Sequence, residues 1–281
     1  MLIAKTITET GHVITNIRTQ GKTIGFVPTM GALHRGHISL QEKSRQENDF
    51  TVCSIFVNPI QFNNPEDLKK YPRTEDKDLR MLEEAGCDLA FVPSVQEMYP
   101  EKNTTVYDFG HLDKVMEGKF RPGHFNGVAV VVKKLFDIIQ PHRAYFGEKD
   151  FQQLAVIKAL VERLKLPVEI IPCPTLRETS GLAMSSRNER LSPADRQTAS
   201  VIYRSMCEAK SMVPKIQPAE IEQLVKEQIN AAAGMQLEYF NLVDAQTLLP
   251  VKEWKPGQAV VGCVAAHIGG VRLIDNMLFF S

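Results

Sequence analysis

The sequence predicts an α/β protein in which a domain built on a parallel sheet is followed by a smaller α+β domain. Over the first part of the chain, short β-branched runs alternate with helical patterns. This alternation is typical of βαβ units with right-handed crossovers. Pro172, Pro174 and Gly181 then interrupt the pattern, and the segments beyond them no longer alternate. We therefore expect one domain over residues 1–176 and a second over residues 177–281.

The first domain is predicted to begin its sheet with the buried run 23–27, which Pro28 would end. Thr74 is a suitable N-cap and Gly86 a suitable residue after the end of a helix between them. The remaining expected elements, in order, are a helix over 36–47, a strand over 50–57, a helix over 75–85, a strand over 88–92, a helix over 125–139, a strand over 143–146, a helix over 149–164 and a strand over 168–171.

The second domain is predicted to contain two helices followed by three strands. We expect the helices near 193–212 and 218–233 and the strands over 237–243, 259–266 and 271–275. His267 to Gly270 resembles a hairpin turn between the last two strands. Residues 176–188 would form a hinge between the domains.

Composition excludes several classes of protein. Lysine and arginine number 33, and aspartate and glutamate also number 33, so the chain lacks the basic surplus of a nucleic-acid binder. No stretch approaches the roughly 20 apolar residues of a membrane span. The five cysteines are widely spaced and form no CxxC pair. This favours a reducing, cytoplasmic setting without structural zinc or disulfides.

The first candidate site is the segment from Pro28 to His37, which follows the first predicted strand and opens a helix. Gly31 and Gly36 would let the backbone approach a ligand closely. A helix start offers N–H groups and a positive dipole end, which suit phosphate. His34 and His37 are three residues apart, so both can donate hydrogen bonds from one side of this start. A plain helix-capping loop is the alternative, but the position between strand and helix favours a nucleotide site.

Two further segments suit a polar acid. Asn58 and Gln61 follow the second predicted strand, and their amides both donate and accept hydrogen bonds. We expect them to recognise a substrate that bears hydroxyls and a carboxylate, although an Asn-Pro turn would use the same residues. Arg121 and His124 stand between glycines, where they could close over the site or hold a carboxylate. An ordinary surface loop is the alternative there.

The segment 146–153 joins another strand to a helix. Gly147 permits close approach, and Lys149 is a mobile positive charge suited to a β- or γ-phosphate oxygen. Asp150 could contact a ribose hydroxyl or stabilise the helix start. Gln153, one turn further on, would face the same crevice.

Near the expected hinge, Ser185, Ser186 and Arg187 could together bind a leaving pyrophosphate. A serine-rich loop with a surface arginine is the alternative. Asp76 and Asp78 follow Thr74, and we expect them to interact favourably with the helix dipole rather than to bind magnesium. The four remaining histidines are far apart and show no ligand spacing, so no metal site is predicted from His12, His111, His142 and His267.

Together these segments resemble the pantothenate synthetase (pantoate–β-alanine ligase) family. PTMGALHRGH, FVNPIQF, RPGHFNGV, FGEKDFQQL and LAMSSRN occur in the family's order and near its spacing, over almost the whole chain. The HxGH segment also resembles a wider superfamily of nucleotidyltransferases and class I synthetases. The resemblance implies a Rossmann-like domain that binds ATP and pantoate over residues 1–176, and a smaller lid domain over residues 177–281.

The resemblance implies an AMP-forming acid–amine ligase of vitamin B5 and coenzyme A biosynthesis. The carboxylate of (R)-pantoate attacks the α-phosphate of ATP to give pantoyl adenylate and pyrophosphate. The amine of β-alanine then displaces AMP and forms pantothenate. The resemblance also implies Mg²⁺ carried by ATP, no tightly bound cofactor, and a homodimer built through the nucleotide-binding domain.

Roles follow residue by residue from the same resemblance. His37 matches the proton donor, and the other groups that oppose phosphate charge are His34, Lys149, Ser186 and Arg187. ATP contacts are implied for Met30, Gly31, His34, His37, Gly147, Glu148, Lys149, Asp150, Leu176, Met184, Ser185, Ser186 and Arg187. Leu176 would contact adenine through its backbone. Gln61 and Gln153 match the pantoate-binding glutamines, and Asn58, Arg121 and His124 are the other expected substrate contacts.

Three alternatives stay open at this point. An adenylyltransferase acting on a phosphorylated cofactor precursor would need a more basic acceptor site than residues 56–62 offer. A tRNA synthetase is disfavoured by the short chain and the zero net charge. A non-catalytic nucleotide sensor would bind ATP without releasing pyrophosphate.

Overall fold

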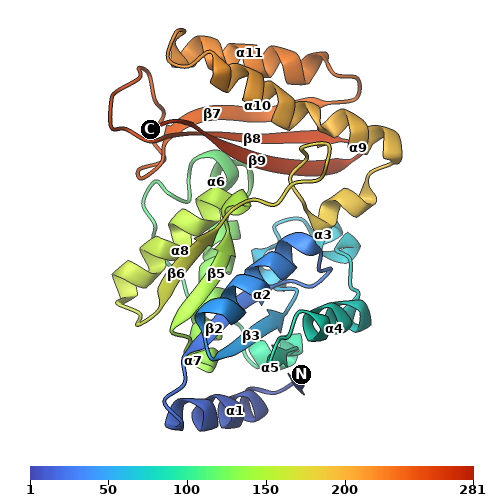
Figure 1. Ribbon diagram of the computed structural model, residues 1–281, viewed down its shortest axis with the longest axis vertical. Coiled ribbons are helices and arrows are strands. Elements are labelled where there is room, and N and C mark those ends of the chain that lie inside the picture. Colours follow the sequence, from blue (N-terminus) through green and yellow to red (C-terminus); the bar gives the residue numbers. More distant parts are fainter. The chain divides into compact units, whose positions relative to one another are not determined.

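A computed structural model describes the whole chain, residues 1–281, and separates it into two compact units (Figure 1). Unit 1 comprises Met1–Lys114, Gly118–Glu148 and Gln153–Pro174. Unit 2 comprises Val115–Glu117, Lys149–Gln152 and Thr175–Ser281. The structure thus divides the chain after Pro174, close to the expected 176/177 boundary. Two short internal segments, Val115–Glu117 and Lys149–Gln152, belong to unit 2 because their contacts are with that unit.

Unit 1 contains a six-stranded sheet in which all neighbouring strands are parallel. The strands are β1 (Leu2–Ala4), β2 (Ile24–Thr29), β3 (Phe50–Ile55), β4 (Leu89–Phe91), β5 (Arg143–Gly147) and β6 (Glu169–Cys173), in the order β1-β4-β3-β2-β5-β6. The chain builds outward from β2 through β3 to β4 and then returns to the other side of β2 with β5. The carboxyl ends of β2 and β5 therefore mark the topological switch point, where sheets of this kind bind ligands.

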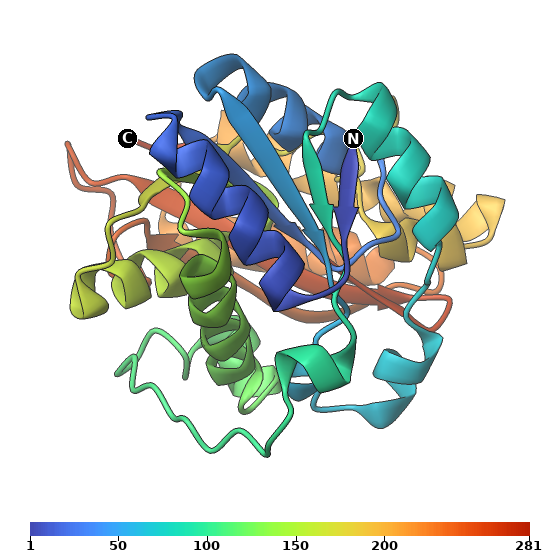
Figure 2. The same cartoon turned by 90° about the horizontal axis from the view of Figure 1, so that it is seen from below.

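The helices of unit 1 cover both faces of this sheet. They are α1 (Ile7–Thr19), α2 (Arg35–Glu47), α3 (Pro65–Lys70), α4 (Glu75–Glu84), α5 (Val95–Met98), α7 (His124–Ile139) and all but the first two residues of α8 (Phe151–Leu164), with the 3₁₀ turn η1 (Pro59–Gln61). The helix α6 (Met116–Phe120) and the 3₁₀ turn η2 (Glu148–Asp150) are divided between the two units. Figure 2 shows the strands between α1 and α7 on one side and α2 and α4 on the other. Consecutive residues of β2 accordingly enter different cores, Phe26 beneath α7 and α8 and Val27 beneath α2 and α4.

Several details of unit 1 differ from the sequence-based expectations. The strand β1 and the helix α1, which begins with a capping box between Thr6 and Glu9, were not predicted, and neither were the short helices α3, α5 and α6. The prediction that Pro28 ends the first strand is wrong, since β2 continues to Thr29. Proline is tolerated there because β2 pairs with β5 only as far as Phe26, so no ladder bond on that side needs the missing N–H. The helix expected from residue 149 begins at 151, after η2.

Unit 2 is an antiparallel three-stranded sheet covered by helices, as the α+β prediction required. Its elements are η3 (Ser186–Arg190), α9 (Pro193–Ala199), α10 (Val201–Ser211), α11 (Pro218–Ala231), β7 (Gln236–Asp244), β8 (Val260–Ile268) and β9 (Val271–Phe280). The predicted hairpin turn is confirmed, because Ile268 pairs with Val271 and both intervening glycines have positive φ, 55° at Gly269 and 72° at Gly270. The single helix expected over 193–212 is two helices that meet at Ser200.

Candidate active site

The backbone of the loop after β2 is fixed by hydrogen bonds to a buried carboxylate. Gly31 has φ of +77° and Ala32 has φ of 50°, so the chain turns sharply before α2. Asp78 of α4 accepts hydrogen bonds from the backbone N–H groups of Ala32 (2.8 Å) and Leu33 (2.7 Å) and from the Thr74 hydroxyl (3.0 Å). A side chain at Gly31 would meet Asp78 Oδ2 at 3.0 Å. The loop thus rests on this carboxylate.

The two histidines of the loop cap α2 reciprocally. His34 is the N-cap, and its Nδ1 accepts a hydrogen bond from the N–H of Gly36 at 3.1 Å. The Nδ1 of His37 accepts one from the N–H of His34 at 3.3 Å, and the two ring centroids lie 4.0 Å apart. In a neutral ring whose Nδ1 accepts, Nε2 carries the proton. Both rings can therefore donate from Nε2 at the positive end of the helix dipole, which is the chemistry that a phosphate needs.

The two amide side chains after β3, Asn58 and Gln61, hydrogen-bond to each other. Asn58 is buried, with only 1% of its surface exposed, and its Nδ2 donates to Gln61 Oε1 (3.0 Å) and to the carbonyl of Gly127 (3.1 Å). Its Oδ1 accepts from the Tyr99 hydroxyl at 2.9 Å. Gln61 donates through Nε2 to the sulfur of Met30 at 3.2 Å. The structure therefore brings Gln61 together with the loop after β2, and gives Asn58 a set of protein partners behind it.

The start of α7 packs directly on this pair. A side chain at Gly127 would lie 2.6 Å from both Gln61 Cα and the carbonyl oxygen of Ile60, so only glycine allows this approach. His124 Nδ1 lies 2.8 Å from the carbonyl oxygen of Gln61, and Arg121 Nη1 lies 3.1 Å from His124 Nε2. Since a carbonyl only accepts and a guanidinium only donates, His124 is neutral with its proton on Nδ1. His124 thus fixes both the Gln61 backbone and the Arg121 side chain.

The residues expected after β5 divide between the units. Gly147 ends β5, and a side chain added there would meet no protein atom within 4 Å, so the fold leaves space around it. Glu148 and Gln153 also belong to unit 1, where both are half-buried. Lys149 and Asp150 belong to unit 2, and Lys149 Nζ lies 3.8 Å from Asp150 Oδ1.

The remaining expected ATP contacts of unit 2 lie on one folded loop. Arg177 forms an antiparallel bridge with Ala183, and the N–H of Met184 donates to the carbonyl of Leu176 at 2.9 Å. Ser185 then caps η3, accepting from the N–H of Arg187 at 3.3 Å. Leu176, Met184, Ser185, Ser186 and Arg187 therefore share one local framework.

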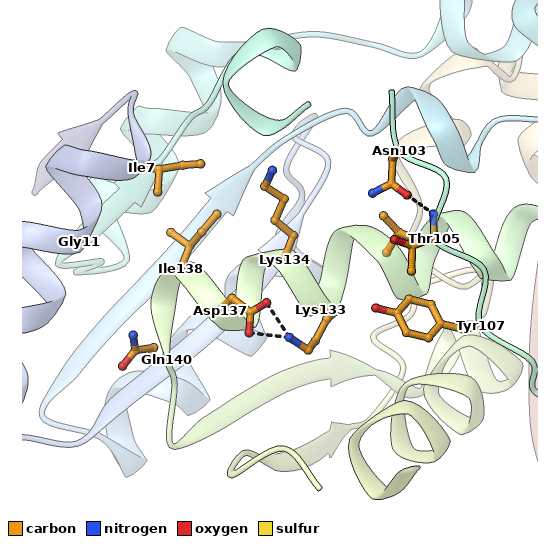
Figure 3. A pocket seen from close by; sticks show the side chains of 11 residues that line it. Ile7, Gly11, Asn103, Thr105, Tyr107, Lys133, Lys134, Asp137, Ile138 and Gln140 are labelled. Carbon is orange, nitrogen blue, oxygen red and sulfur yellow. Dashed lines mark hydrogen bonds and ion pairs between the residues drawn. The ribbon is translucent and has the colours of Figure 1, made fainter. Parts of the chain in front are cut away.

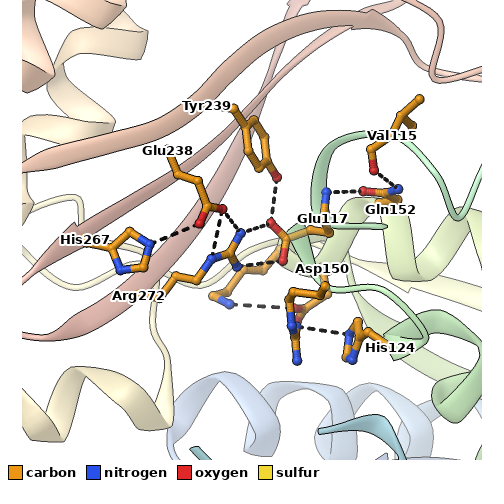
Figure 4. A network of polar contacts seen from close by, with 11 residues as sticks. Val115, Glu117, His124, Asp150, Gln152, Glu238, Tyr239, His267 and Arg272 are labelled. Carbon is orange, nitrogen blue, oxygen red and sulfur yellow. Dashed lines mark hydrogen bonds and ion pairs between the residues drawn. The ribbon is translucent and has the colours of Figure 1, made fainter. Parts of the chain in front are cut away.

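A polar network fastens the two short segments of unit 2 to its sheet (Figure 4). Both Arg272 Nη atoms donate to Glu117 at 2.7 Å, and Arg272 Nε donates to Glu238 at 3.1 Å. Burial alone would lower the pKa of Arg272, but the hydrogen bonds to Glu117 and Glu238 raise it above its ordinary value. The Gln152 side chain accepts from the N–H of Glu117 at 3.0 Å and donates to the carbonyl of Val115 at 2.8 Å. Segments 115–117 and 149–152 are thereby tied to each other and to β9.

A separate groove in unit 1 contains none of the predicted site residues (Figure 3). It has a volume of about 630 Å³ and is lined by Ile7, Gly11, Asn103, Thr105, Tyr107, Val130, Lys133, Lys134, Asp137, Ile138 and Gln140. Its cations have protein partners, because Lys133 donates to Asp137 at 2.7 Å and Lys134 donates to the carbonyl of Met98. The groove therefore offers no predicted site residue, and both of its lysines are already engaged by protein acceptors.

Sequence reasoning missed the residues that support the site. Asp78 was expected to act on the helix dipole; it is buried, and its hydrogen bonds hold the loop after β2. A weak signal existed, since Asp78 lies four residues before buried Leu82 on the inner side of α4. Tyr99 behind Asn58, and Asp275 and Asn276 of β9, gave no recognisable signal.

All five cysteines are free thiols, and only Cys207 is exposed. The structure holds no group of three or more His, Cys, Asp or Glu side chains placed to bind a metal ion. None of the helices is both long and apolar enough to cross a lipid bilayer.

Comparison with known proteins identifies the family of this chain. The family model for pantoate-beta-alanine ligase matches residues 2–278. A pantothenate synthetase of Bacteroides thetaiotaomicron is 50% identical over 279 residues, which are 99% of each chain. Among solved structures, pantothenate synthetase from Thermus thermophilus has a TM-score of 0.93 and 44% identity over 100% of both chains. Pantoate-beta-alanine ligase from Francisella tularensis, complexed with beta-gamma ATP and beta-alanine, has a TM-score of 0.81 and 37% identity over 99% of this chain and 98% of that one.

Proposed function

Because the chain belongs to the pantoate–β-alanine ligase family, we propose that it condenses pantoate with β-alanine in two steps through a pantoyl adenylate. It is an ATP-dependent ligase. In the first step a pantoate carboxylate oxygen bonds to the α-phosphorus of ATP, and pyrophosphate leaves with the electrons of the broken P–O bond. In the second step the β-alanine amine bonds to the acyl carbon and loses a proton, and AMP leaves.

The observation that carries this proposal is the reciprocal histidine cap at the start of α2. Negative charge moves onto the leaving pyrophosphate in the first step, and donors fixed before the reaction oppose it without reorganisation. His34 and His37 have their Nδ1 atoms engaged in the cap, which orients each Nε2 donor. Met30 and Gly31 would line the same nucleotide with their backbone, next to the positive dipole end.

Pantoate is assigned to the amide side of the site. Gln61 would hydrogen-bond the hydroxyls and carboxylate of pantoate, with Gln153 as the second amide. Asn58 and His124 would hold Gln61 in place from behind, because both contact it directly. Arg121, oriented by His124, would supply a cation to a carboxylate.

The remaining proposed ATP contacts are the backbone and side chains at 147–150, Leu176 and 184–187. Lys149, Ser186 and Arg187 would oppose charge on the phosphates during the first step. Mg²⁺ is proposed to arrive as part of the substrate MgATP, whose phosphate oxygens are the hard ligands that this ion prefers. No other cofactor is proposed.

The decisive experiment is pantoate-dependent exchange of labelled pyrophosphate into ATP, with Mg²⁺ and without β-alanine. Exchange is expected, because the first step is reversible and stops at the adenylate. Adding β-alanine should then consume the adenylate and release AMP and pantothenate. ATP binding without exchange would contradict the proposal, and would leave either another acceptor or a nucleotide sensor.

We further propose that the enzyme is a cytoplasmic homodimer that binds no nucleic acid. Free thiols throughout the chain suit a reducing compartment, and the balanced charge gives no general attraction to phosphate backbones. Light scattering after size-exclusion chromatography should give twice the chain mass, and a monomer mass at micromolar concentration would contradict the dimer.

A further inference from the structure

Two adjacent residues of β9, Asp275 and Asn276, each hold a different segment of unit 2. The buried carboxylate of Asp275 accepts two hydrogen bonds from the Arg177 guanidinium, at 2.5 and 3.0 Å. The side-chain amide of Asn276 donates to the backbone carbonyl of Lys149 at 2.9 Å. Because β9 is paired with β8 along its length, both residues are fixed points on one rigid strand.

The Asp275–Arg177 pair closes the turn that leads into Ser185 and the residues after it. Arg177 Nη1 also donates to the carbonyl of Gly181 at 3.1 Å, and its guanidinium lies 4.1 Å from the ring centroid of Tyr203. Gly181 has φ of +88°, and a side chain there would strike Tyr203 at 2.3 Å. The turn from 177 to 183 is thus shaped around one guanidinium, whose direction Asp275 sets.

The Asn276 contact acts on the second segment. Lys149 is only 17% exposed in its side chain, so little space is available for its ammonium to adjust if the backbone shifts. Holding the Lys149 carbonyl fixes the point from which this side chain extends. The two contacts are also joined, because the backbone N–H of Asn276 donates to Asp275 Oδ1 at 2.8 Å.

A purely stabilising role explains this arrangement poorly. A buried ion pair contributes little net stability, because desolvation of both charges offsets their attraction. Burial raises the pKa of Asp275, and this shift is opposed by the hydrogen bonds and charge of Arg177, by the N–H of Asn276 and by the charge of Lys149. The value of the pair lies in its geometry, since a bidentate contact fixes both distance and direction.

We propose that Asp275 and Asn276 are positioning residues that hold Lys149 and the loop carrying Ser185, Ser186 and Arg187 in one common frame for the phosphates of ATP. This inference rests on the ATP roles given to these residues under the proposed function. Neither Asp275 nor Asn276 would touch the nucleotide itself.

The test is a double-mutant cycle between Asn276→Ala and Lys149→Ala, read by the KM values for ATP and pantoate in pyrophosphate exchange and by calorimetric binding of MgATP. Asn276→Ala should raise the KM for ATP about tenfold, because small misplacements of a charged contact are costly. The KM for pantoate should change less than twofold. In the Lys149→Ala background, Asn276→Ala should cause no further loss of ATP affinity.

The outcomes separate this inference from the proposed function. If Lys149→Ala weakens ATP but the two losses multiply, Asn276 acts independently and the inference is overturned alone. If Lys149→Ala leaves ATP affinity unchanged, the assigned role of Lys149 fails and the inference falls with it. A second cycle combines Asp275→Asn with Arg187→Ala and should likewise show no additive loss of ATP affinity. If Asp275→Asn does not fold, the cycle between Asn276→Ala and Lys149→Ala alone tests the inference. Val225→Ala, in the core of unit 2, is the control that should lower thermal stability but not ATP affinity.

Discussion

The carboxylate of Asp78 in α4 holds the backbone N–H of Leu33 at 2.7 Å and thereby sets the path of the loop that presents His34. The carboxylate belongs to a helix more than 40 residues further along the chain, so the loop's shape depends on tertiary packing. Its hydrogen bonds satisfy N–H groups that the sharp turn at Gly31 would otherwise leave buried without partners.

We expect Asp78→Asn to damage both stability and catalysis. An asparagine offers one acceptor oxygen where two are used, and one backbone N–H would face an NH₂ group. An unsatisfied buried donor costs about 1–3 kcal/mol in unfolding free energy, and the displaced histidines should lower pyrophosphate exchange. Urea unfolding and the exchange assay measure these effects. Asp76→Asn, at an exposed position in the same helix, is the matched control and should change neither.

His37 can be divided into its capping and donor functions by two substitutions. His37→Asn keeps an acceptor near Nδ1 but lacks the Nε2 donor, so exchange should fall roughly 10²-fold while stability changes little. His37→Gln places an amide donor near Nε2 but loses the cap, which should cost about 1 kcal/mol of stability and less of the activity. Exchange near the wild-type rate in His37→Asn would remove Nε2 from the mechanism.

Gln61→Ala should act on pantoate alone. Removing the amide leaves polar groups of bound pantoate without partners, at a cost of about 1–3 kcal/mol, so the KM for pantoate should rise at least severalfold. The KM for ATP should stay within twofold. Asn58 donates a hydrogen bond to Gln61, so Asn58→Ala should show a smaller rise in the KM for pantoate together with lower stability. An unchanged KM for pantoate in Gln61→Ala would refute the assignment.

The structure also predicts a pH dependence of stability. His142 is an exposed residue whose Nδ1 accepts the N–H of Ile24 at 2.9 Å. Partial desolvation of the ring, followed by the charges of Arg18 and Arg143, lowers its pKa below 6.5. The unfolded chain then binds the proton more readily, so this contribution to stability is present above about pH 6.5 and is lost as the pH falls through the lowered pKa.

The test for His142 compares urea unfolding at pH 7 and pH 5. His142→Asn keeps an acceptor near Nδ1 and removes the titration, so it should lose less stability on acidification than the wild type. His12→Asn removes an exposed imidazole that accepts no backbone N–H of the sheet and should retain the wild-type loss. Equal losses in all three proteins would show that His142 does not contribute.

Thiol labelling should distinguish the exposed Cys207 from the four buried cysteines. Burial raises the pKa of Cys87 to about 12 and that of Cys173 to about 11, and Cys53 and Cys263 are also buried. A thiol-specific reagent at neutral pH should therefore modify one group rapidly in the folded protein and five after denaturation. Cys207→Ser should abolish the rapid reaction and leave pyrophosphate exchange unchanged. Rapid labelling of more than one thiol would contradict the burial.

Local patterns predicted most of the regular structure. The alternation of β-branched runs and helical patterns gave the parallel sheet, because strand and helix periodicities are properties of the segment itself. Strand β1 was missed because it has only three residues, two of which, Leu2 and Ile3, are half exposed. Its structure comes from pairing with β4, at a separation of almost 90 residues, and no local pattern reports such a partner.

Within the candidate site, the sequence indicated which side chains could bind a ligand, but not which residues hold those side chains in place. The placement of His34 and His37 after a strand predicts a phosphate site from the sequence, and the structure confirms that both residues cap the start of α2. The sequence could not predict that Asn58 is buried and hydrogen-bonds to Gln61, since both are amides after the same strand. Only the hydrogen bonds of Asn58 to Tyr99 and Gly127 distinguish its role from that of Gln61.

By itself, the sequence determined the order of the longer strands and most of the longer helices, the loops that follow the strands, and the groups in those loops that suit phosphate and a polar acid. These follow from short-range periodicity, capping and side-chain chemistry. Tertiary structure alone decided that Asp78 supports the loop before α2, and that Asp275 and Asn276 hold segments about 100 and 130 residues away. Such contacts depend on which distant residues the packed sheet brings together, and a buried polar group is placed by that packing, not by its sequence neighbours.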